Sequence, residues 1–211
     1  MNNFSNNYFF DIDKFAYKEI FAATPWETIA NIIPFIQKTF ASLKLSPNYK
    51  NRPDVYIGQG TTIHPSVDIQ GPAIIGVNCK ISHAAFLREG CLIGDNVHIG
   101  HAVEIKHSLI LNNSMIAHLN YIGDSLIGNN VNISGGAILA NLRLDKQNIS
   151  IKTEDNKKID TGLNKFSAAI GDNSVVGVNA VINPGTLLGK NVIVFPLKSV
   201  SGVHINNATI K

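Results

Sequence analysis

Two basic side chains stand at a spacing that suits a bound anion. Arg88 and Lys106 are 18 residues apart, and each directly follows an aliphatic residue. If the chain coils once every 18 residues, the two cations stack on one outer face, about 4.8 Å apart at the backbone. Adjacent cations repel each other unless an anion bridges them, and the planar fork of arginine suits a phosphate group. The alternative is that both cations are solvated and pair with Glu89 and Glu104.

One histidine has the chemistry of a general base. His118 lies where the spacing of aliphatic residues shortens from six to five, and local irregularities of β-structure often re-aim a side chain toward a site. Many nucleophiles, amines among them, must lose a proton before or during their attack. Histidine titrates in the range that lets it accept such a proton near pH 7. His118 is therefore a candidate catalytic base.

Two further histidines suggest a metal site as an alternative. His83 and His101 are also 18 residues apart and should stack on each other. Together with His118 they could supply the three imidazoles of a zinc site. The β-helical γ-type carbonic anhydrases place two ligands five residues apart, but the positions five residues from His118 are Asn113 and Gly123. We therefore expect no metal, and a plain stacked pair of histidines on an outer face.

Aliphatic residues at strict six-residue steps predict the fold that positions these side chains. The first run is Ile57, Ile63, Ile69, Ile75, Ile81, Leu87, Ile93, Ile99, Ile105 and Leu111, continued by Ala117. Two five-residue steps then lead to Ile122 and Ile127, followed by Ile133 and Leu139. The second run is Ile170, Val176, Ile182, Leu188, Val194 and Val200. An α-helix would space apolar residues by three or four and an amphipathic strand by two, so neither explains six.

The other positions of the six-residue unit agree with this repeat. The fifth position is small or slender, as a second inward-facing side chain should be. Its members include Thr61, Val67, Ala73, Cys79, Ala85, Cys91, Val97, Val103, Val131, Ala137, Ser174, Ala180 and Thr186. Both cysteines are therefore expected to act as small hydrophobic core residues. The pattern resembles the hexapeptide repeat of left-handed parallel β-helices, which implies an all-β fold with three units in each triangular coil.

An N-terminal helical segment is expected over residues 1–50, outside the repeat. Residues 24–27 (Thr-Pro-Trp-Glu) have the pattern of a capping box with proline at the first helical position. A helix is predicted over about 25–44, with a kink at Pro34. A shorter helix is predicted over about 12–21.

The β-helix domain is expected over residues 51–211. An insertion at about 143–168 interrupts it, because this stretch is rich in charged residues and has no period of six. We expect the insertion to form a hairpin or loop that leaves the coil, and long insertions of this kind often carry function.

Composition and charge argue against other classes of function. The net charge of +3 comes without a cluster of Lys and Arg, so we expect no nucleic-acid partner. No apolar run reaches the roughly 18 residues of a membrane span, and the N-terminal residues lack the pattern of a signal peptide. Two cysteines are too few for a disulfide framework. We expect a cytoplasmic protein with no membrane partner.

The stretch between residues 86 and 142 resembles a known family in detail. The matching segments are 103–106, 117–124, 127–132 and Asn141. They look like the acetyltransferase half of bifunctional glucosamine-1-phosphate N-acetyltransferase/N-acetylglucosamine-1-phosphate uridylyltransferase. Arg-Glu-Gly at 88–90 matches the Arg-Pro-Gly element of that family, and 141–145 resembles the archaeal-type bifunctional sugar-1-phosphate nucleotidylyltransferase/acetyltransferases. We expect no counterpart of the nucleotidyltransferase half, because its Gly-rich loop is not found in this sequence.

This resemblance implies roles for individual residues. His118 matches the catalytic base of the family. Arg88 and Lys106 match the basic residues that hold the sugar phosphate. The other matches are substrate-binding positions: Tyr121, Asn132, Asn141 near the acetyl group and the sugar amine, and Lys165 in the insertion.

The resemblance also implies a reaction. The chain would be an acetyl-CoA-dependent N-acetyltransferase acting on an amino-sugar 1-phosphate, with glucosamine 1-phosphate as the expected acceptor, in UDP-N-acetylglucosamine synthesis. Acetyl-CoA would be a co-substrate, no metal would be required, and binding sites would lie between the subunits of a homotrimer. One alternative is a hexapeptide acyltransferase with another acceptor or a UDP-N-acetylglucosamine pyrophosphorylase-related protein. Another is a non-catalytic trimeric scaffold for a separate nucleotidyltransferase.

Overall fold

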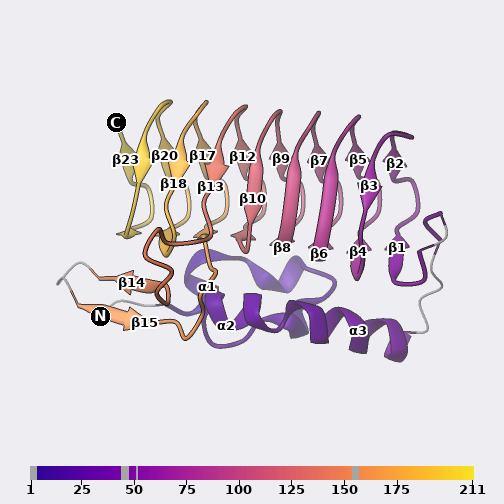
Figure 1. The fold of residues 1–211 in the computed structure, drawn as a ribbon, viewed down its shortest axis with the longest axis horizontal. Coiled ribbons are helices and arrows are strands. Elements are labelled where there is room, and N and C mark those ends of the chain that lie inside the picture. The colour runs from indigo at the N-terminus through magenta and orange to yellow at the C-terminus, as the bar shows by residue number, and fades with distance from the viewer. Residues whose placement is uncertain (1–3, 44–47, 51, 154–156) are drawn as a thin grey trace.

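The chain folds into a left-handed parallel β-helix with helices lying along one side of it (Figure 1). The structure is a computed structural model that describes residues 4–43, 48–50, 52–153 and 157–211. Strands in neighbouring coils pair in parallel and in register, as at Ile63 and Ile81. The predicted all-β fold with an N-terminal helical segment is therefore confirmed.

Each coil crosses three flat faces. Face 1 consists of β3 (Asp68–Ile69), the first halves of β6 (Phe86–Ile93) and β8 (Glu104–Ile110), β10 (Tyr121–Gly123), β13 (Ile138–Leu139), β18 (Val181–Ile182) and β21 (Ser199–Val200). Face 2 consists of β1 (Val55–Ile57), β4 (Ala73–Ile75), the second halves of β6 and β8, β11 (Leu126–Ile127), β16 (Ala168–Ile170), β19 (Thr186–Leu188) and β22 (Val203–His204). Face 3 consists of β2 (Thr62–Ile63), β5 (Lys80–Ile81), β7 (His98–Ile99), β9 (Met115–Ile116), β12 (Asn132–Ile133), β17 (Val175–Val176), β20 (Ile193–Val194) and β23 (Thr209–Ile210).

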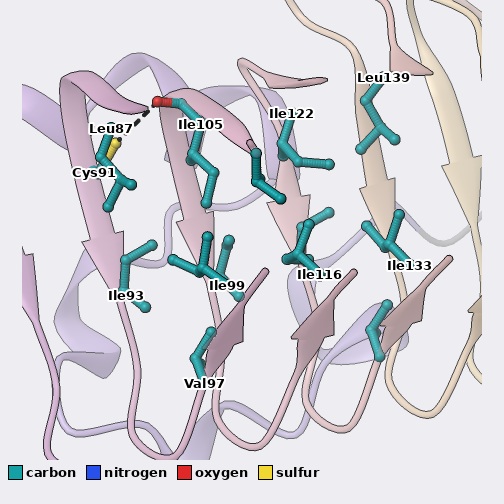
Figure 2. Packing of buried hydrophobic residues seen from close by; sticks show 14 of the residues in the cluster. Leu87, Cys91, Ile93, Val97, Ile99, Ile105, Ile116, Ile122, Ile133 and Leu139 are labelled. Atoms are coloured by element: carbon teal, nitrogen blue, oxygen red, sulfur yellow. Dashed lines mark hydrogen bonds between the residues drawn. The ribbon is translucent and has the colours of Figure 1, made fainter. Parts of the chain in front are cut away.

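The interior of the coils is filled by the inward-facing residues of the repeat. Figure 2 shows aliphatic side chains of successive coils, such as Ile99, Ile116 and Ile133, lying next to one another in a row along the coils. Cys91 is fully buried among them, with its Sγ 3.6 Å from the carbonyl oxygen of Ile105. The core role predicted for the cysteines is confirmed. Each fully buried Leu or Ile side chain contributes about 1.5–3 kcal/mol, so the stack is the main source of stability.

The phase of the repeat differs from the prediction at two positions. Ile110 and Ile116, rather than Leu111 and Ala117, face the interior. Leu111 is buried outside the coil against the N-terminal segment, and Ala117 is partly exposed. The reason is that the shortened step runs from Ile105 to Ile110, at the corner after Lys106, and a shift of one residue reverses the face of every following side chain in a strand.

The capping box predicted for the N-terminal segment is confirmed. The backbone N–H of Glu27 donates to Oγ1 of Thr24 at 3.4 Å, and the N–H of Thr24 donates to Oε2 of Glu27 at 3.0 Å. These bonds satisfy two donors at the start of α2 (Pro25–Ala30) that have no partner within the helix.

The segment predicted as one helix over 25–44 with a kink at Pro34 is helical, but it is divided into two helices by a break at Asn31, before the proline. α2 ends at Ala30 and α3 (Ile32–Leu43) begins after Asn31. Pro34 has no N–H to donate to the carbonyl of Ala30, and its ring would clash with that carbonyl in a continuous helix. The break before Pro34 places the proline in the first turn of α3, where a missing N–H costs little.

The helix predicted over 12–21 is also wrong. This region contains two short 3₁₀ turns, η1 (Ile12–Lys14) and η2 (Lys18–Ile20), after the short helix α1 (Asn6–Phe9). Their positions are fixed by packing rather than by helix propensity, because Phe15 and Ile20 are buried in a second hydrophobic core.

This second core lies between the helices and the outside of face 2. Outward-facing Leu92, Leu109 and Leu126 of successive coils are fully buried there. They meet Ile32 and Ile36, among other residues of the N-terminal segment. Face 2 is thus apolar on both sides, which is why the helices run along the coils in Figure 1.

The insertion contains a β-hairpin, as the sequence predicts. β14 (Ser150–Lys152) and β15 (Lys158–Asp160) pair antiparallel, with Ile151 opposite Ile159. Ile151 joins the second core, so the hairpin is fixed to the outside of face 2. Within the described residues, every helix is too short or too polar to cross a lipid bilayer.

Candidate functional site

The corner between faces 1 and 2 carries the two predicted phosphate-binding cations. Arg88 of β6 and Lys106 of β8 are Cα partners in adjacent coils, as their spacing predicts. The pairing then shifts by one residue, so that Glu89 and Gly90 lie opposite His107 alone. A bulge of this kind re-aims the side chains around it. Glu89 itself adopts a left-handed backbone conformation with φ of 56°, which few residues other than glycine favour.

Carboxylates compensate both cations. Nη2 of Arg88 lies 2.7 Å from Oε1 of Glu104. Nζ of Lys106 lies 3.0 Å from Oε2 of Glu89 and 3.5 Å from Oδ2 of Asp124. The other oxygen of Glu89 forms an ion pair with Arg88. The pairing that the sequence left as an alternative is therefore present, and Glu89 bridges the two cations.

Asp124 is the buried centre of this arrangement, which we call the charged corner (Arg88, Glu89, Glu104, Lys106, His107, Tyr121, Asp124 and Asn141). Its Oδ1 accepts a hydrogen bond from Nδ1 of His107 at 2.9 Å, and its Oδ2 accepts one from the amide of Asn141. Burial raises the pKa of Asp124, but the hydrogen bonds from His107 and Asn141 and the charge of Lys106 outweigh it, so the pKa is lowered. Asp124 is therefore ionised at neutral pH.

Lys106 stays charged although its side chain is only 8% exposed. Burial lowers its pKa, whereas the hydrogen bond to Glu89 and the charges of Asp124 and Glu89 raise it more strongly, and the pKa ends above its ordinary value. Lys106 is thus a fixed cation. Asp124 contacts it from the buried side, and Glu89, whose side chain is 53% exposed, contacts it from the solvent side.

Tyr121 and Asn141 complete the charged corner on face 1. Nδ2 of Asn141 donates to the hydroxyl of Tyr121 at 3.0 Å. A Cβ on Gly123 would lie only 2.6 Å from that hydroxyl oxygen, so the glycine makes room for the ring to lie along the strand. Burial and the charge of Asp124 raise the pKa of Tyr121, and its phenol therefore remains protonated and able to donate to a ligand.

His118 does not lie in the charged corner. It is exposed at the corner between faces 3 and 1, two residues after inward-facing Ile116, and the step there is a regular six residues. The expectation that it sits at a shortened step is therefore wrong. The strand β10 separates His118 from Asp124. Its three residues alone span about 10 Å along the chain. No hydrogen bond or ion pair in the described part of the chain joins His118 to the charged corner.

The structure brings some of the predicted substrate-binding residues together and leaves others apart. Arg88, Lys106, Tyr121 and Asn141 meet at the charged corner. Lys165 is exposed close to it, because it precedes Phe166, whose N–H donates to the carbonyl of Asn141 at 3.2 Å.

Asn132 lies elsewhere, on the outside of face 3. Its neighbours in the adjacent coils are Met115 and Val175. Asn132 is exposed, and its side chain shares this face with apolar residues rather than with the charged corner.

The stacked histidines behave as the sequence predicts. The rings of His83 and His101 lie 4.5 Å apart between centroids and 4° from parallel. The ring of His64 meets His83 edge-on at 5.4 Å. Among the described residues, no three His, Cys, Asp or Glu side chains come close enough together to hold a metal ion.

Comparison with known proteins places the chain in a family. The family model of the GMPPB C-terminal domain matches residues 69–210. The chain belongs to the GMPPB C-terminal domain family. Bifunctional protein GlmU of Methanococcus aeolicus is 34% identical over 189 residues, which are 88% of this chain and 43% of the relative. The bifunctional sugar-1-phosphate nucleotidylyltransferase/acetyltransferase of Sulfurisphaera tokodaii is 35% identical over 112 residues, 53% of this chain and 28% of the relative.

This member of the GMPPB C-terminal domain family thus spans less than half the length of these curated relatives. The resemblance to GlmU and the archaeal bifunctional proteins predicted from residues 86–142 is confirmed as homology. Among solved structures, UDP-N-acetylglucosamine acyltransferase of Francisella novicida superposes with a TM-score of 0.53 at 20% identity, covering 74% of this chain and 52% of that one. This likeness shows the fold.

Sequence reasoning about this GMPPB C-terminal domain protein missed Asp124, His107 and the bridging role of Glu89. One signal could have located the first two. The five-residue steps from Ile105 to Ile110 and from Ile122 to Ile127 contain them. A shortened coil changes how a corner is built, so polar residues inside it are candidates for a site.

Proposed function

We propose that this chain transfers the acetyl group of acetyl-CoA to the amine of an amino-sugar 1-phosphate, with glucosamine 1-phosphate as the acceptor, for UDP-N-acetylglucosamine synthesis. The observation that carries the proposal is the charged corner: Arg88 and Lys106 lie side by side, in a homologue of a bifunctional sugar-1-phosphate nucleotidylyltransferase/acetyltransferase. A fixed lysine and a planar guanidinium suit a phosphate group.

In the proposed reaction, Arg88 and Lys106 hold the phosphate of the acceptor, while Tyr121 and Asn141 contact the sugar. The neutral amine attacks the thioester carbon, an N–C bond forms, and the C–S bond breaks. The amine proton passes to a histidine, and the CoA thiolate takes up a proton. No covalent acetyl-enzyme and no metal is part of this scheme.

His118 is our proposed base, and the geometry requires a second subunit for it to act beside Lys106. β10 separates the two corners within one chain, so a base at one corner can reach a phosphate held at the other if a neighbouring subunit packs against face 1. We therefore propose a homotrimer with the site between subunits, to which Asn132 and Lys165 also contribute. Light scattering should give about three times the chain mass of 22.9 kDa, and a monomer would contradict this assembly.

His107 is the rival base, because it lies in the charged corner itself. Its Nδ1 donates to Asp124, which leaves Nε2 as a proton acceptor, and the carboxylate stabilises the imidazolium that would form. His107 therefore needs no second subunit to reach a ligand on Lys106.

A coupled assay with glucosamine 1-phosphate and acetyl-CoA tests these assignments. If His118 is the base, His118→Ala lowers kcat by roughly 10²–10⁴-fold and changes acceptor binding little. Arg88→Ala should instead weaken acceptor binding by about 1.5–3 kcal/mol. High pH should partly rescue His118→Ala, since the amine then loses its proton unaided. A parent rate for His118→Ala with a large loss in His107→Ala would assign the base to His107.

The same assay separates the alternative functions. Turnover of acetyl-CoA with another amine would favour a hexapeptide acyltransferase with a different acceptor or a pyrophosphorylase-related protein. No turnover with any amino sugar, together with a stable trimer, would favour a scaffold for a separate nucleotidyltransferase. A zinc content near one per chain, with activity lost to a chelator, would contradict the metal-free scheme. We place the reaction in the cytoplasm, where a nucleotide-sugar route would supply its acceptor.

A further inference from the structure

The carboxylate of Glu89 occupies the position between the two cations of the charged corner. One oxygen contacts Nη1 of Arg88 and the other lies 3.0 Å from Nζ of Lys106. Glu104 contacts Arg88 alone, and Asp124 approaches Lys106 from the buried side. Glu89 is therefore the one carboxylate in this described corner that bridges both cations on the solvent side.

The fold aims Glu89 at this position. The corner after Arg88 has the regular six-residue step from Leu87 to Ile93, whereas the facing corner of the next coil is one residue shorter, so Glu89 and Gly90 lie opposite His107 alone. Glu89 has the left-handed conformation, with φ of 56°, that His107 and Asp124 also adopt at this corner in the next coils. At this pair of corners of unequal length, Glu89 reaches both Arg88 and Lys106.

The cations are held and the carboxylate is free to leave. The side chains of Arg88 and Lys106 are 25% and 8% exposed, whereas that of Glu89 is 53% exposed. Lys106 is also fixed from below by Asp124. Rotation of Glu89 into solvent would therefore open the space between the cations without disturbing the core.

We infer that Glu89 is a tethered anion that fills the phosphate position of the charged corner and is displaced by a ligand with a doubly charged phosphoryl group. The inference rests on the proposed function, because it concerns the same cations. With Glu89 in place, two cations face three carboxylates, so a further anion gains nothing by approaching. A dianion that replaces Glu89 brings one more negative charge to Arg88 and Lys106 than Glu89 supplies. A monoanionic phosphodiester only matches it, so Glu89 selects monoesters over diesters.

Titrations with inorganic phosphate and dimethyl phosphate at pH 8 test this inference, because phosphate is then a dianion and the diester a monoanion. Binding is followed by NMR on the full chain. Wild type should bind phosphate and show no measurable binding of dimethyl phosphate. Glu89→Ala should bind phosphate about two- to tenfold more tightly, since a partly exposed ion pair no longer competes, and should gain binding of the diester. Glu89→Gln should show the same direction.

Glu104→Gln is the matched control, because it removes one negative charge from the same corner without vacating the bridging position. Its gain in phosphate affinity should be at least about threefold smaller than that of Glu89→Ala. Equal gains would reduce the effect to net charge and overturn the inference, as would failure of phosphate to bind either wild type or Glu89→Ala. In the wild type, phosphate should also shift the side-chain carboxyl ¹³C resonance of Glu89, and an unmoved resonance at saturation would contradict displacement.

These outcomes are distinct from those of the proposed function. If phosphate binds as expected but glucosamine 1-phosphate is not acetylated, the proposed acceptor is wrong, and the inference that a ligand displaces Glu89 still holds. If glucosamine 1-phosphate is acetylated with the same KM by wild type and Glu89→Ala, the reaction stands and Glu89 is a simple surface ion pair.

Discussion

Asp124→Asn is the substitution that should show how far the charged corner depends on its buried centre. Asp124 has a side chain that is 5% exposed and accepts hydrogen bonds from both His107 and Asn141. Asparagine keeps the shape but replaces one acceptor oxygen by an NH₂ group, which then faces a donor. It also removes a negative charge beside Lys106, which is buried.

The expected cost follows from these contacts. Removing one member of a fully buried ion pair costs about 3–5 kcal/mol, but Lys106 retains Glu89, so we expect about 3 kcal/mol. For a chain of this length, that corresponds to a fall in melting temperature of roughly 6–12 °C. Urea unfolding and thermal melts at one fixed protein concentration measure the change.

Asp145→Asn is the control for this experiment. Asp145 pairs with Arg143 on the surface of the insertion, where such a pair contributes little to stability. The Asp145→Asn variant should therefore unfold at the same temperature and urea concentration as the parent. A free energy of unfolding for Asp124→Asn within about 0.5 kcal/mol of the parent value would refute the view that the buried carboxylate organises the corner.

Three further predictions concern pH, packing and the thiols. Because the folded state lowers the pKa of Asp124 below its ordinary value of 3.8, its contribution is complete above about pH 4 and is lost as pH falls further; acid titrations of stability should therefore be flatter for Asp124→Asn than for the parent. Leu109→Ala removes a fully buried side chain from the second core and should cost about 2–4 kcal/mol and speed proteolysis of the N-terminal segment, while Leu144→Ala, on a side chain fully exposed to solvent, should change neither. Burial raises the pKa of Cys91 to about 12, so a disulfide reagent at pH 8 should modify it only as fast as the chain unfolds; rapid modification of the native protein would show that the coil opens locally.

The period of six, through its resemblance to hexapeptide repeats, was sufficient to predict the fold, because the period is a local property of the chain. Inward aliphatic residues and small fifth positions must recur at the length of one strand and one turn, and the core of Ile69, Ile99 and Ile133 follows this rule. The spacing of Arg88 and Lys106 was readable for the same reason, since 18 residues return the chain to the same face. The repeat, recognised by its resemblance to hexapeptide proteins, thus predicted both the coil and its pair of cations.

The position of the shortened step was not readable in the same way. Ile110 and Leu111 are neighbouring aliphatic residues, and either can continue the period of six. Which of them faces the interior depends on the second core, because Leu111 is buried only when the N-terminal segment covers the outside of the coil. The sequence therefore assigned the irregularity to His118, while the structure has it beside Lys106 and His107.

The sequence by itself determined that Arg88 and Lys106 lie in adjacent coils on one face, and it singled out His118, Tyr121 and Asn141 as candidates. Tertiary structure decided which of them meet. Asp124 and Asn141 join the cations because short corners and neighbouring coils bring them to one edge, whereas His118 and Asn132 are directed to other faces of the same triangle. The physical reason is that a one-residue change in the length of a corner rotates side chains between faces, and packing against the whole molecule fixes where that change occurs.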